Sequence, residues 1–328
     1  MTHDWQKLQE IAYRLTERLK ACDICPHRCG VNRLLGDIGH CGIGAECRVA
    51  SWCDHHGEEP AISGTRGSGT IFAAGCNLKC VYCQNHQISQ GEFGKYDAYS
   101  AKQLADVMLQ LQARGCHNIN LVSPTHVVPQ FVSALALAAR DGLNLPVVYN
   151  SNGYDNAGVL NLLDDVVDIY LPDLKYADPV IAAELSGAPN YPDIAIAAIG
   201  EMYRQKGALT TDDNGIAISG VIVRHLVLPG NLSGSREILS RLATEVSPDI
   251  TVSIMAQYFP THRANEYKQY PLQRTITADE YEEAIDAFAD AGLENGWAQE
   301  LSEAPENYQP DFDKEEHPFE ERRVKREE

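Results

Sequence analysis

Residues 75–85 read Gly75-Cys76-Asn77-Leu78-Lys79-Cys80-Val81-Tyr82-Cys83-Gln84-Asn85. Three residues separate the first two cysteines, two separate the second and third, and the aromatic Tyr82 precedes the last. Thiolates at this spacing can bind three irons of a 4Fe–4S cube and leave the fourth iron without a protein ligand. Because ferredoxin-type electron carriers use four thiolates for each cube, three thiolates predict chemistry at the cluster itself. A zinc knuckle or a group of buried thiols is the alternative interpretation.

The rest of the chain predicts alternating strands and helices. An apolar run leads into the cysteine loop, and apolar runs then alternate with amphipathic segments. Six strands separated by helices predict parallel pairing with right-handed crossovers, and therefore an α/β fold. The expected strands are 70–74, 118–122, 146–149, 166–171, 220–228 and 250–257. The expected helices are 1–20, one that begins at a capping box at 100–103, 127–141, 155–164, 193–206, 233–246 and 277–291.

Composition and periodicity divide the chain into three parts. Residues 1–60 are expected to form an amphipathic helix and a cysteine-rich region that a metal holds together, since this region is too short and irregular for a core of its own. Residues 61–300 contain the alternating strands and helices and are expected to form the core barrel. Residues 301–328 are rich in charged and poor in aliphatic residues, which predicts a largely disordered tail.

Composition also restricts the class of protein. The chain has 328 residues and a formal net charge of −19, which argues against a nucleic-acid partner. No apolar run reaches the roughly 18 residues that a membrane span needs, and the N-terminus lacks a signal-peptide core. Nine of the ten cysteines lie between residues 22 and 83, which predicts metal binding in a reducing compartment. We therefore expect a cytoplasmic protein without a membrane partner.

A second group of cysteines precedes the loop at 75–85. Four thiolates on two arms predict a closed tetrahedral site, which suits zinc or a second 4Fe–4S cluster. Two further cysteines, Cys47 and Cys53, are spare, and either can replace one of the four. The predicted ligands are Cys22, Cys25, Cys29 and Cys41.

Polar side chains follow the expected strands at their carboxyl ends, where βα barrels collect functional groups. Groups of this kind at successive strand ends predict a site for a charged ligand, although each can also form a surface salt bridge or a turn. The segments are Ser123-Pro-Thr-His126, Tyr149-Asn-Ser-Asn-Gly153, Leu171-Pro-Asp-Leu-Lys175, Arg224-His225 and Gln257-Tyr-Phe-Pro-Thr-His262.

The cysteine loop resembles the motif of the radical S-adenosylmethionine (SAM) superfamily. The resemblance implies that the open iron chelates the amino and carboxylate groups of SAM. It also implies that an electron from the cluster cleaves SAM to methionine and a 5′-deoxyadenosyl radical. The expected fold is the partial (β/α)6 barrel of that family, which is open on one side.

The same resemblance suggests which residues contact SAM. Asp173 and Lys175 resemble the Asp-x-Lys segment that faces SAM in glycyl-radical activating enzymes. Asn150 and Asn152 match an Asn-Gly type of turn after the third strand, and Arg224 matches a carboxylate-binding arginine on the fifth. A catalytic residue is not identified. These five residues are the expected SAM contacts.

The chain departs from the family pattern after the second strand. Many members carry a Gly-Gly-Glu-like segment there, which binds the methionine ammonium. Here the segment is Ser-Pro-Thr-His, so either Thr125 or His126 takes that role or SAM lies differently. A structural role for His126 is the other interpretation.

Longer phrases resemble one branch of the superfamily, the PflX-like relatives of the pyruvate formate-lyase activating enzyme. They include Gly-Glu-Glu-Pro60, Asn120-Leu-Val-Ser-Pro-Thr-His126 and Gln257-Tyr-Phe-Pro260. The resemblance implies a radical SAM enzyme that abstracts hydrogen, as in the activation of a glycyl-radical protein. The expected partners are a reductant such as flavodoxin or ferredoxin and a protein substrate. The alternatives are radical modification of a small molecule or another macromolecule, and a non-catalytic metal-binding protein.

Overall fold

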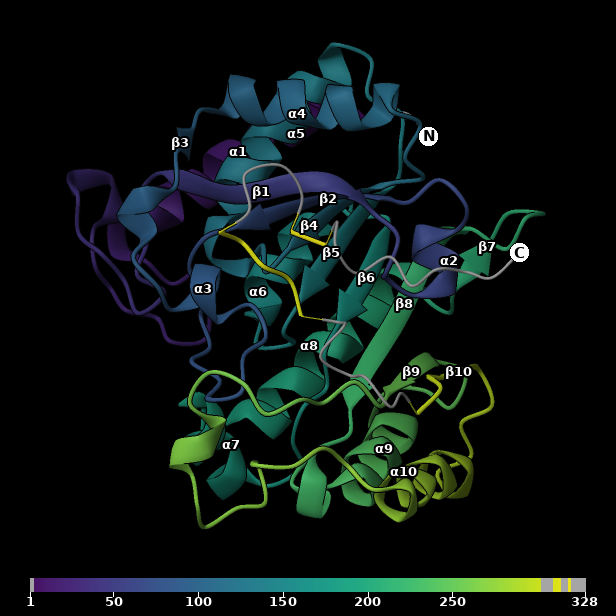
Figure 1. The fold of residues 1–328 in the computed structure, drawn as a ribbon. Coiled ribbons are helices and arrows are strands. Elements are labelled where there is room, and N and C mark those ends of the chain that lie inside the picture. The colour runs from purple at the N-terminus through teal and green to yellow at the C-terminus, as the bar shows by residue number, and fades with distance from the viewer. Residues whose placement is uncertain (1–2, 302–308, 314–317, 320–328) are drawn as a thin grey trace.

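The computed structural model describes residues 3–301, 309–313 and 318–319. An open sheet lies at the centre, and helices cover its outer face (Figure 1). The strands are β1 (Cys47–His55), β2 (Ser68–Ala73), β3 (Ala98–Tyr99), β4 (Ile119–Val122), β5 (Val147–Ser151), β6 (Ile169–Pro172), β7 (Thr210–Thr211), β8 (Ala217–Leu226), β9 (Thr251–Met255) and β10 (Gly296–Ala298). The α-helices are α1 (Trp5–Glu17), α2 (Pro60–Ser63), α3 (His86–Ser89), α4 (Ala101–Ala113), α5 (Val128–Arg140), α6 (Ala157–Leu160), α7 (Pro179–Ser186), α8 (Tyr191–Lys206), α9 (Ser235–Glu245) and α10 (Ala278–Asp290). Short 3₁₀ helices are η1 (Arg18–Ala21), η2 (Arg33–Leu35), η3 (Phe93–Lys95), η4 (Thr125–Val127), η5 (Asn161–Leu163), η6 (Pro229–Asn231) and η7 (Ala264–Glu266).

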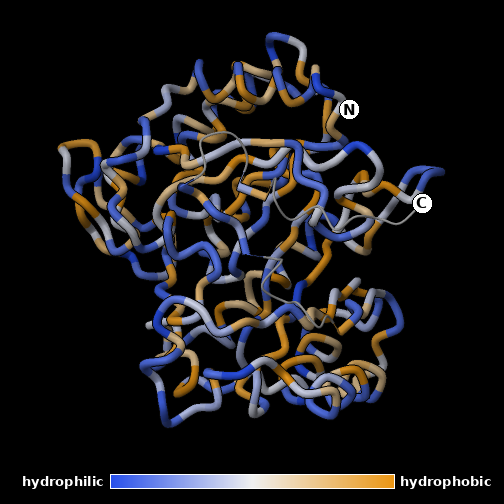
Figure 2. The backbone as a smooth tube through the Cα atoms, viewed as in Figure 1, coloured by the Kyte–Doolittle hydropathy of each residue, from blue (hydrophilic) through white to orange (hydrophobic). Residues whose placement is uncertain are grey.

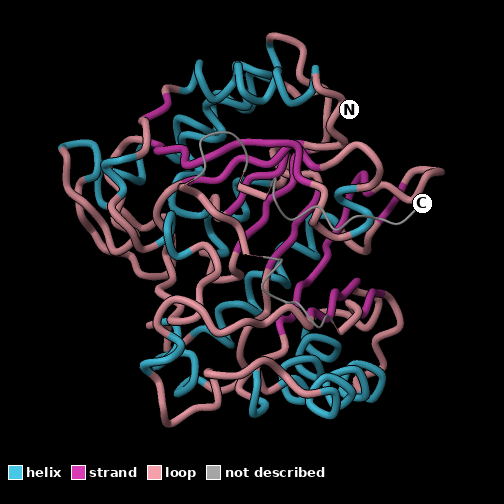
Figure 3. Tube along the Cα trace, viewed as in Figure 1, coloured by secondary structure: helices cyan, strands magenta, loops and turns pink. Residues whose placement is uncertain are grey.

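The sheet is an unclosed α/β barrel. Its strand order is β10-β9-β8-β6-β5-β4-β2-β1-β3, with β7 paired to β8. Figure 3 shows the strands in magenta and the helices in cyan. The six predicted strands correspond to β2, β4, β5, β6, β8 and β9, and each pairs in parallel with the next. The predicted fold class, a partial barrel of alternating strands and helices, is therefore confirmed.

Burial explains why the inner strands have apolar sequences. Every residue of β2, β4, β5 and β6 is buried, as expected for parallel strands covered on both faces. Apolar segments accordingly lie through the middle of the molecule, and hydrophilic loops surround them (Figure 2). The N-terminal helix joins this core, because α1 packs against α5 through buried residues that include Leu8, Ile11 and Leu15. Trp5, which helical spacing places on the same face, is 39% exposed.

Strand β1 was not predicted. The cysteine-rich region before residue 60 was expected to be irregular. β1 pairs antiparallel with β2 and extends the sheet into the N-terminal region. Cys47, Val49 and Cys53 are buried, and all three have odd residue numbers. Buried side chains therefore recur at every second position, except at Ser51, as expected of a strand with one buried face. A register shift between Val49 and Ser51 interrupts that period and obscures it.

Helix α7 is a second element that the sequence analysis missed. It begins after Asp178, whose carboxylate accepts a hydrogen bond from the Val180 amide at 2.6 Å. Pro179 occupies its first turn, and Gly187 ends it with a φ of +69°. An N-cap aspartate, a proline and a final glycine are helix signals, but the eight-residue segment between them lacks a polar face.

The C-terminal segment is packed where the structure describes it. Phe312 is buried against Phe72, with ring centroids 5.2 Å apart, and Phe319 stacks on His55 at 4.1 Å. Residues 309–313 and 318–319 thus include aromatic rings that pack against the barrel and bury apolar surface, and disorder of the tail as a whole stays a prediction. The other residues beyond 301 lie outside the described residues. Within the described residues, no helix has the length and apolar character to cross a membrane.

Candidate functional site

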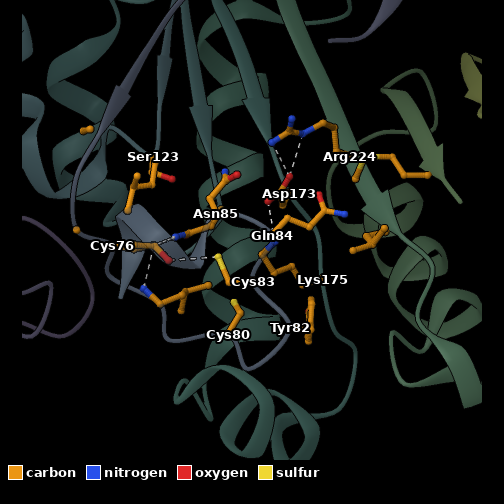
Figure 4. Close-up of a pocket in the computed structure, with 18 of the residues that line it drawn as sticks. Cys76, Cys80, Tyr82, Cys83, Gln84, Asn85, Ser123, Asp173, Lys175 and Arg224 are labelled. Atoms are coloured by element: carbon orange, nitrogen blue, oxygen red, sulfur yellow. Dashed lines mark hydrogen bonds and ion pairs between the residues drawn. The ribbon is translucent and has the colours of Figure 1, made fainter. Parts of the chain in front are cut away.

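A cavity with a volume of about 200 Å³ opens at the carboxyl ends of the parallel strands. The three cysteines of the predicted cluster loop line it, together with charged side chains from β6 and β8 (Figure 4). Residues from strands far apart in the sequence thus meet at one site, as expected for a βα barrel. Its polar lining comprises Cys76, Cys80, Tyr82, Cys83, Gln84, Asn85, Ser89, Ser123, Asn152, Asp173, Lys175, Arg224 and Gln257.

The cysteine loop follows β2 directly and turns at Gly75. This glycine has a φ of +86°, and a Cβ there would lie 2.9 Å from the carbonyl oxygen of Cys41. A side chain is therefore excluded on both conformational and steric grounds. The Gly75 amide donates to the Ile88 carbonyl oxygen at 2.8 Å, which ties the loop to α3.

Hydrogen-bond donors point at the loop sulfurs. The Leu78 amide and the Asn152 side-chain amide each donate to Cys76 Sγ at 3.4 Å. The Ser186 hydroxyl donates to Cys80 Sγ at 2.9 Å. Such donors favour a thiolate, and hydrogen bonds to the sulfurs are one way in which proteins tune iron–sulfur clusters.

Burial has the opposite effect and favours the neutral thiols. It raises the pKa values of Cys76 and Cys80, and raises the pKa of Cys83 to about 12. Without a metal the three groups therefore remain thiols at neutral pH, since it is metal coordination that makes thiolates stable in such surroundings. The donor set of two buried cysteines and one partly buried cysteine, with hydrogen bonds to their sulfurs, fits a 4Fe–4S cluster.

Among the described residues, no three His, Cys, Asp or Glu side chains converge as ligands of one metal ion. A cube does not require such convergence, because each thiolate binds a different iron.

A chain of buried charges lies beside the cysteines. The Arg224 guanidinium donates to Asp173 Oδ1 at 2.9 Å from Nε, and its Nη1 lies 3.3 Å from Glu58 Oε2. Lys175 Nζ lies 2.7 Å from Asp173 Oδ2, so the four charges alternate in sign. Asp173 thus lies between the two cations (Figure 4). Burial raises the pKa of Asp173, but Arg224 and Lys175 outweigh this effect and hold the pKa below its ordinary value.

The five expected SAM contacts occupy different positions in this site. Asp173, Lys175 and Asn152 line the cavity, and so does Arg224. Arg224, however, already has two carboxylate partners and also donates to Asn150 Oδ1 at 2.6 Å. Asn150 does not line the cavity, and its amide donates to Glu58 Oε1 at 3.2 Å. Arg224 and Asn150 therefore hold the charges in place at the wall of the cavity.

The residues after the second predicted strand do not supply an acidic group. His126 is fully buried, its Nε2–H donates to the Ala74 carbonyl oxygen at 2.8 Å, and burial lowers its pKa to about 4. The Thr125 hydroxyl donates to Asp155 at 2.7 Å. Neither residue lines the cavity, so the structural interpretation of His126 is the one that its contacts favour. Ser123 does line it, with a φ of +52° that few non-glycine residues adopt.

The four N-terminal cysteines lie near one another and near the cluster loop. Burial raises the pKa of Cys25 to about 12, and the neighbouring Cys41, Cys29 and Cys22 raise it further. The Cys41 carbonyl oxygen accepts a hydrogen bond of 3.4 Å from the Cys76 amide. The two spare cysteines, Cys47 and Cys53, are buried on β1.

Sequence reasoning missed Glu58 and Glu59, which reach the barrel interior from the segment between β1 and α2. Glu59 is buried, its Oε2 has no hydrogen-bond partner among the described residues, and burial raises its pKa to about 7. Both lie in the phrase Gly-Glu-Glu-Pro60, which carries a family resemblance but did not mark them as site residues. Two consecutive acids before a short helix were the available signal, but only the fold shows that Glu58 contacts Arg224.

The match to a protein-family profile agrees with this geometry. Residues 70–231, which include the cysteine loop, Asp173, Lys175 and Arg224, match the profile of the radical SAM superfamily. An uncharacterized protein of Methanocaldococcus jannaschii, MJ0674, is 34% identical over 274 residues, which are 81% of this chain and 74% of that protein. The crystal structure of methylornithine synthase (PylB) aligns at 15% identity and a TM-score of 0.42, over 77% of this chain and 74% of that one. The chain belongs to the radical SAM superfamily.

Proposed function

We propose that this chain is a radical SAM enzyme of the PflX-like, activating-enzyme-like kind, which abstracts hydrogen from a protein substrate to generate a glycyl-type radical. The observation that supports it is the meeting of three cysteines with the charges of Asp173 and Lys175 in one cavity. When bound there, the cluster and SAM supply a 5′-deoxyadenosyl radical by one-electron reductive cleavage of SAM.

The side chains around the cavity have distinct roles in this proposal. Cys76, Cys80 and Cys83 bind three irons. Asp173 accepts a hydrogen bond from a cationic group of SAM, and Lys175 donates one to its carboxylate, since both line the cavity with partly exposed ends. Asn152 lines the cavity and orients the loop, donating to Asn77 Oδ1 at 2.7 Å as well as to Cys76.

The proposed substrate is a protein, and the open side of the barrel supports this choice. An unclosed sheet leaves one side of the barrel without a strand, which suits the entry of a peptide loop. Modification of a small molecule is the second candidate, because the same open side admits one. A protein with ten free cysteines suits a reducing compartment, so we also place its work in the cytoplasm. A second metal centre at the N-terminal cysteines, either zinc or 4Fe–4S, completes the proposed cofactors.

The proposed activity is tested with anaerobically reconstituted protein, dithionite, SAM and candidate substrate proteins. We expect 5′-deoxyadenosine to form, and deuterium to move from a backbone-labelled substrate into it. Label transfer from a small molecule instead would select the second candidate, and 5′-deoxyadenosine at background level would reject SAM cleavage.

Asp173→Ala tests the binding site separately. We expect SAM affinity to fall about tenfold or more while the iron content stays unchanged, because the variant removes a charged hydrogen-bond partner and no iron ligand. Asp193→Ala, an exposed aspartate paired with Arg241 on the surface, is the matched control. Equal SAM affinity in both variants would assign Asp173 a purely structural role.

A further inference from the structure

The two groups of cysteines are in direct contact through their backbones. The Cys76 amide donates to the Cys41 carbonyl oxygen at 3.4 Å. One residue further on, the Asn77 carbonyl oxygen accepts a hydrogen bond of 2.7 Å from His27 Nε2, which lies between Cys25 and Cys29 in the sequence. Candidate ligands of one centre are therefore hydrogen-bonded to the loop that carries the ligands of the other.

The N-terminal group resembles an iron–sulfur ligand set in its local chemistry. Its first three cysteines repeat the spacing of Cys76, Cys80 and Cys83 in reverse order, two residues and then three. The His40 amide donates to Cys29 Sγ at 3.3 Å. Gly39 leaves room beside the sulfurs, since a Cβ there would lie 3.5 Å from Cys29 Sγ and 3.8 Å from Cys41 Sγ.

A buried cation indicates that this group carries negative charge. Arg33 is 1% exposed and donates to the carbonyl oxygens of Gly44 and His126 and, at 3.9 Å, to Cys22 Sγ. Within the described part of the chain, no carboxylate forms an ion pair with Arg33. Because a buried charge needs a compensating partner, an anionic centre with four thiolates is the partner that the surroundings offer.

We propose that Cys22, Cys25, Cys29 and Cys41 hold a second 4Fe–4S cluster that passes single electrons to the first. One electron leaves a reduced carrier protein and reduces the second cluster. It then crosses the Cys41–Cys76 contact to the first cluster and is consumed when SAM is cleaved. The inference rests on the proposed function, in which each cleavage of SAM requires one electron.

The outer side of this region offers a place for the carrier. The loop that contains Arg33 exposes Leu34 by 38%, Leu35 by 83% and Ile38 by 63%, and Ile38 directly precedes Gly39 beside the sulfurs. Exposed apolar side chains next to a redox centre suit the small, transient interface of an electron carrier. The proposed occupant is a flavodoxin- or ferredoxin-type protein.

The test compares two electron sources for the reconstituted full-length protein. We expect wild-type protein to contain about eight irons, and Cys25→Ser/Cys29→Ser to retain about four. The variant should keep the electron paramagnetic resonance (EPR) signal of the first cluster and its cleavage of SAM with dithionite. With reduced flavodoxin its rate should fall about tenfold or more. Cys116→Ala, which changes a buried cysteine away from both groups, should match wild type.

Leu35→Asp keeps the test independent of whether the cysteine variant folds. We expect normal iron content, normal dithionite-driven cleavage and a raised KM for flavodoxin, because a carboxylate buried at the interface would oppose docking. Zinc instead of iron, one EPR-active cluster in wild type, or equal losses with both reductants in the cysteine variant would overturn the relay. Absence of 5′-deoxyadenosine from wild type with dithionite would instead overturn the proposed function.

Discussion

A chain of alternating charges lies along the wall of the cavity, and its members are all partly or fully buried. Glu58, Arg224, Asp173 and Lys175 alternate as acid and base, so the group has no net charge. Such an arrangement adds little stability compared with apolar packing, but it holds each charged side chain in one orientation. Here it holds Asp173 and Lys175 at the wall of the cavity.

Arg224→Met tests how strongly the chain of charges depends on its central cation. The change leaves Glu58 and Asp173 buried without their partner, so we expect the free energy of unfolding to fall by about 3–5 kcal/mol. Arg236→Met, which removes an exposed ion pair with Asp290, should cost about 1 kcal/mol or less. Urea unfolding of both variants measures the difference, and equal costs would contradict the account.

Glu59→Gln tests the pH dependence that a raised pKa predicts. The folded protein holds the Glu59 pKa near 7, above its ordinary value, so the unfolded chain releases this proton first as the pH rises. The contribution of Glu59 to the free energy of unfolding is therefore largest at acid pH. It decreases between about pH 4.5 and 7 and stays constant above that range.

The glutamine side chain that replaces Glu59 does not titrate, so the variant should gain about 1–3 kcal/mol relative to wild type by about pH 8. Chemical unfolding at pH values from about 5 to 8 measures this gain. A difference between the two proteins that stays constant over this range would show that Glu59 ionises normally.

For single residues, the sequence predicts the cysteines that bind the cluster, because these cysteines lie close together in the chain. Cys76, Cys80 and Cys83 lie in one loop and line one cavity. The role of Arg224 could not be predicted, because its partners come from three separate segments. Glu58 reaches it from the cysteine-rich region that a metal was expected to hold together.

Among the elements, the long periodic ones were predictable and the short or interrupted ones were not. The six inner strands, and helices such as α4 and α5, have clear periods because one or both of their faces are buried. In β1 a bulge breaks the alternation, and in α7 the polar face is missing. Packing against the rest of the barrel determines β1 and α7. A local sequence pattern carries no information about that packing.

Leu15→Ala tests whether α1 is part of the barrel core. Leu15 is fully buried where α1 packs against α5, so we expect the free energy of unfolding to fall by about 2–5 kcal/mol. Tyr13→Ala on the same helix removes a side chain that is 67% exposed and should change stability by about 0.5 kcal/mol or less. A similar small effect for both would mean that α1 folds apart from the barrel.

In the whole molecule, three features meet at one end of the sheet. The cluster loop leaves β2 there, and the charges of β6 and β8 line the same cavity. Cys41 of the N-terminal group is hydrogen-bonded to that loop. An unclosed barrel thus brings the predicted cluster, the proposed SAM contacts and the proposed electron entry together, while α1 and β1 secure the N-terminal region to the core.

The most direct test of the account replaces Cys76, Cys80 and Cys83 with alanine together. After anaerobic reconstitution with iron, sulfide and SAM, dithionite should yield 5′-deoxyadenosine with wild-type protein and none above background with the triple variant. Cys116→Ala provides the matched control and should retain wild-type yield. Formation of 5′-deoxyadenosine by a folded triple variant at the wild-type rate would contradict the central claim that these three cysteines hold the cluster that cleaves SAM.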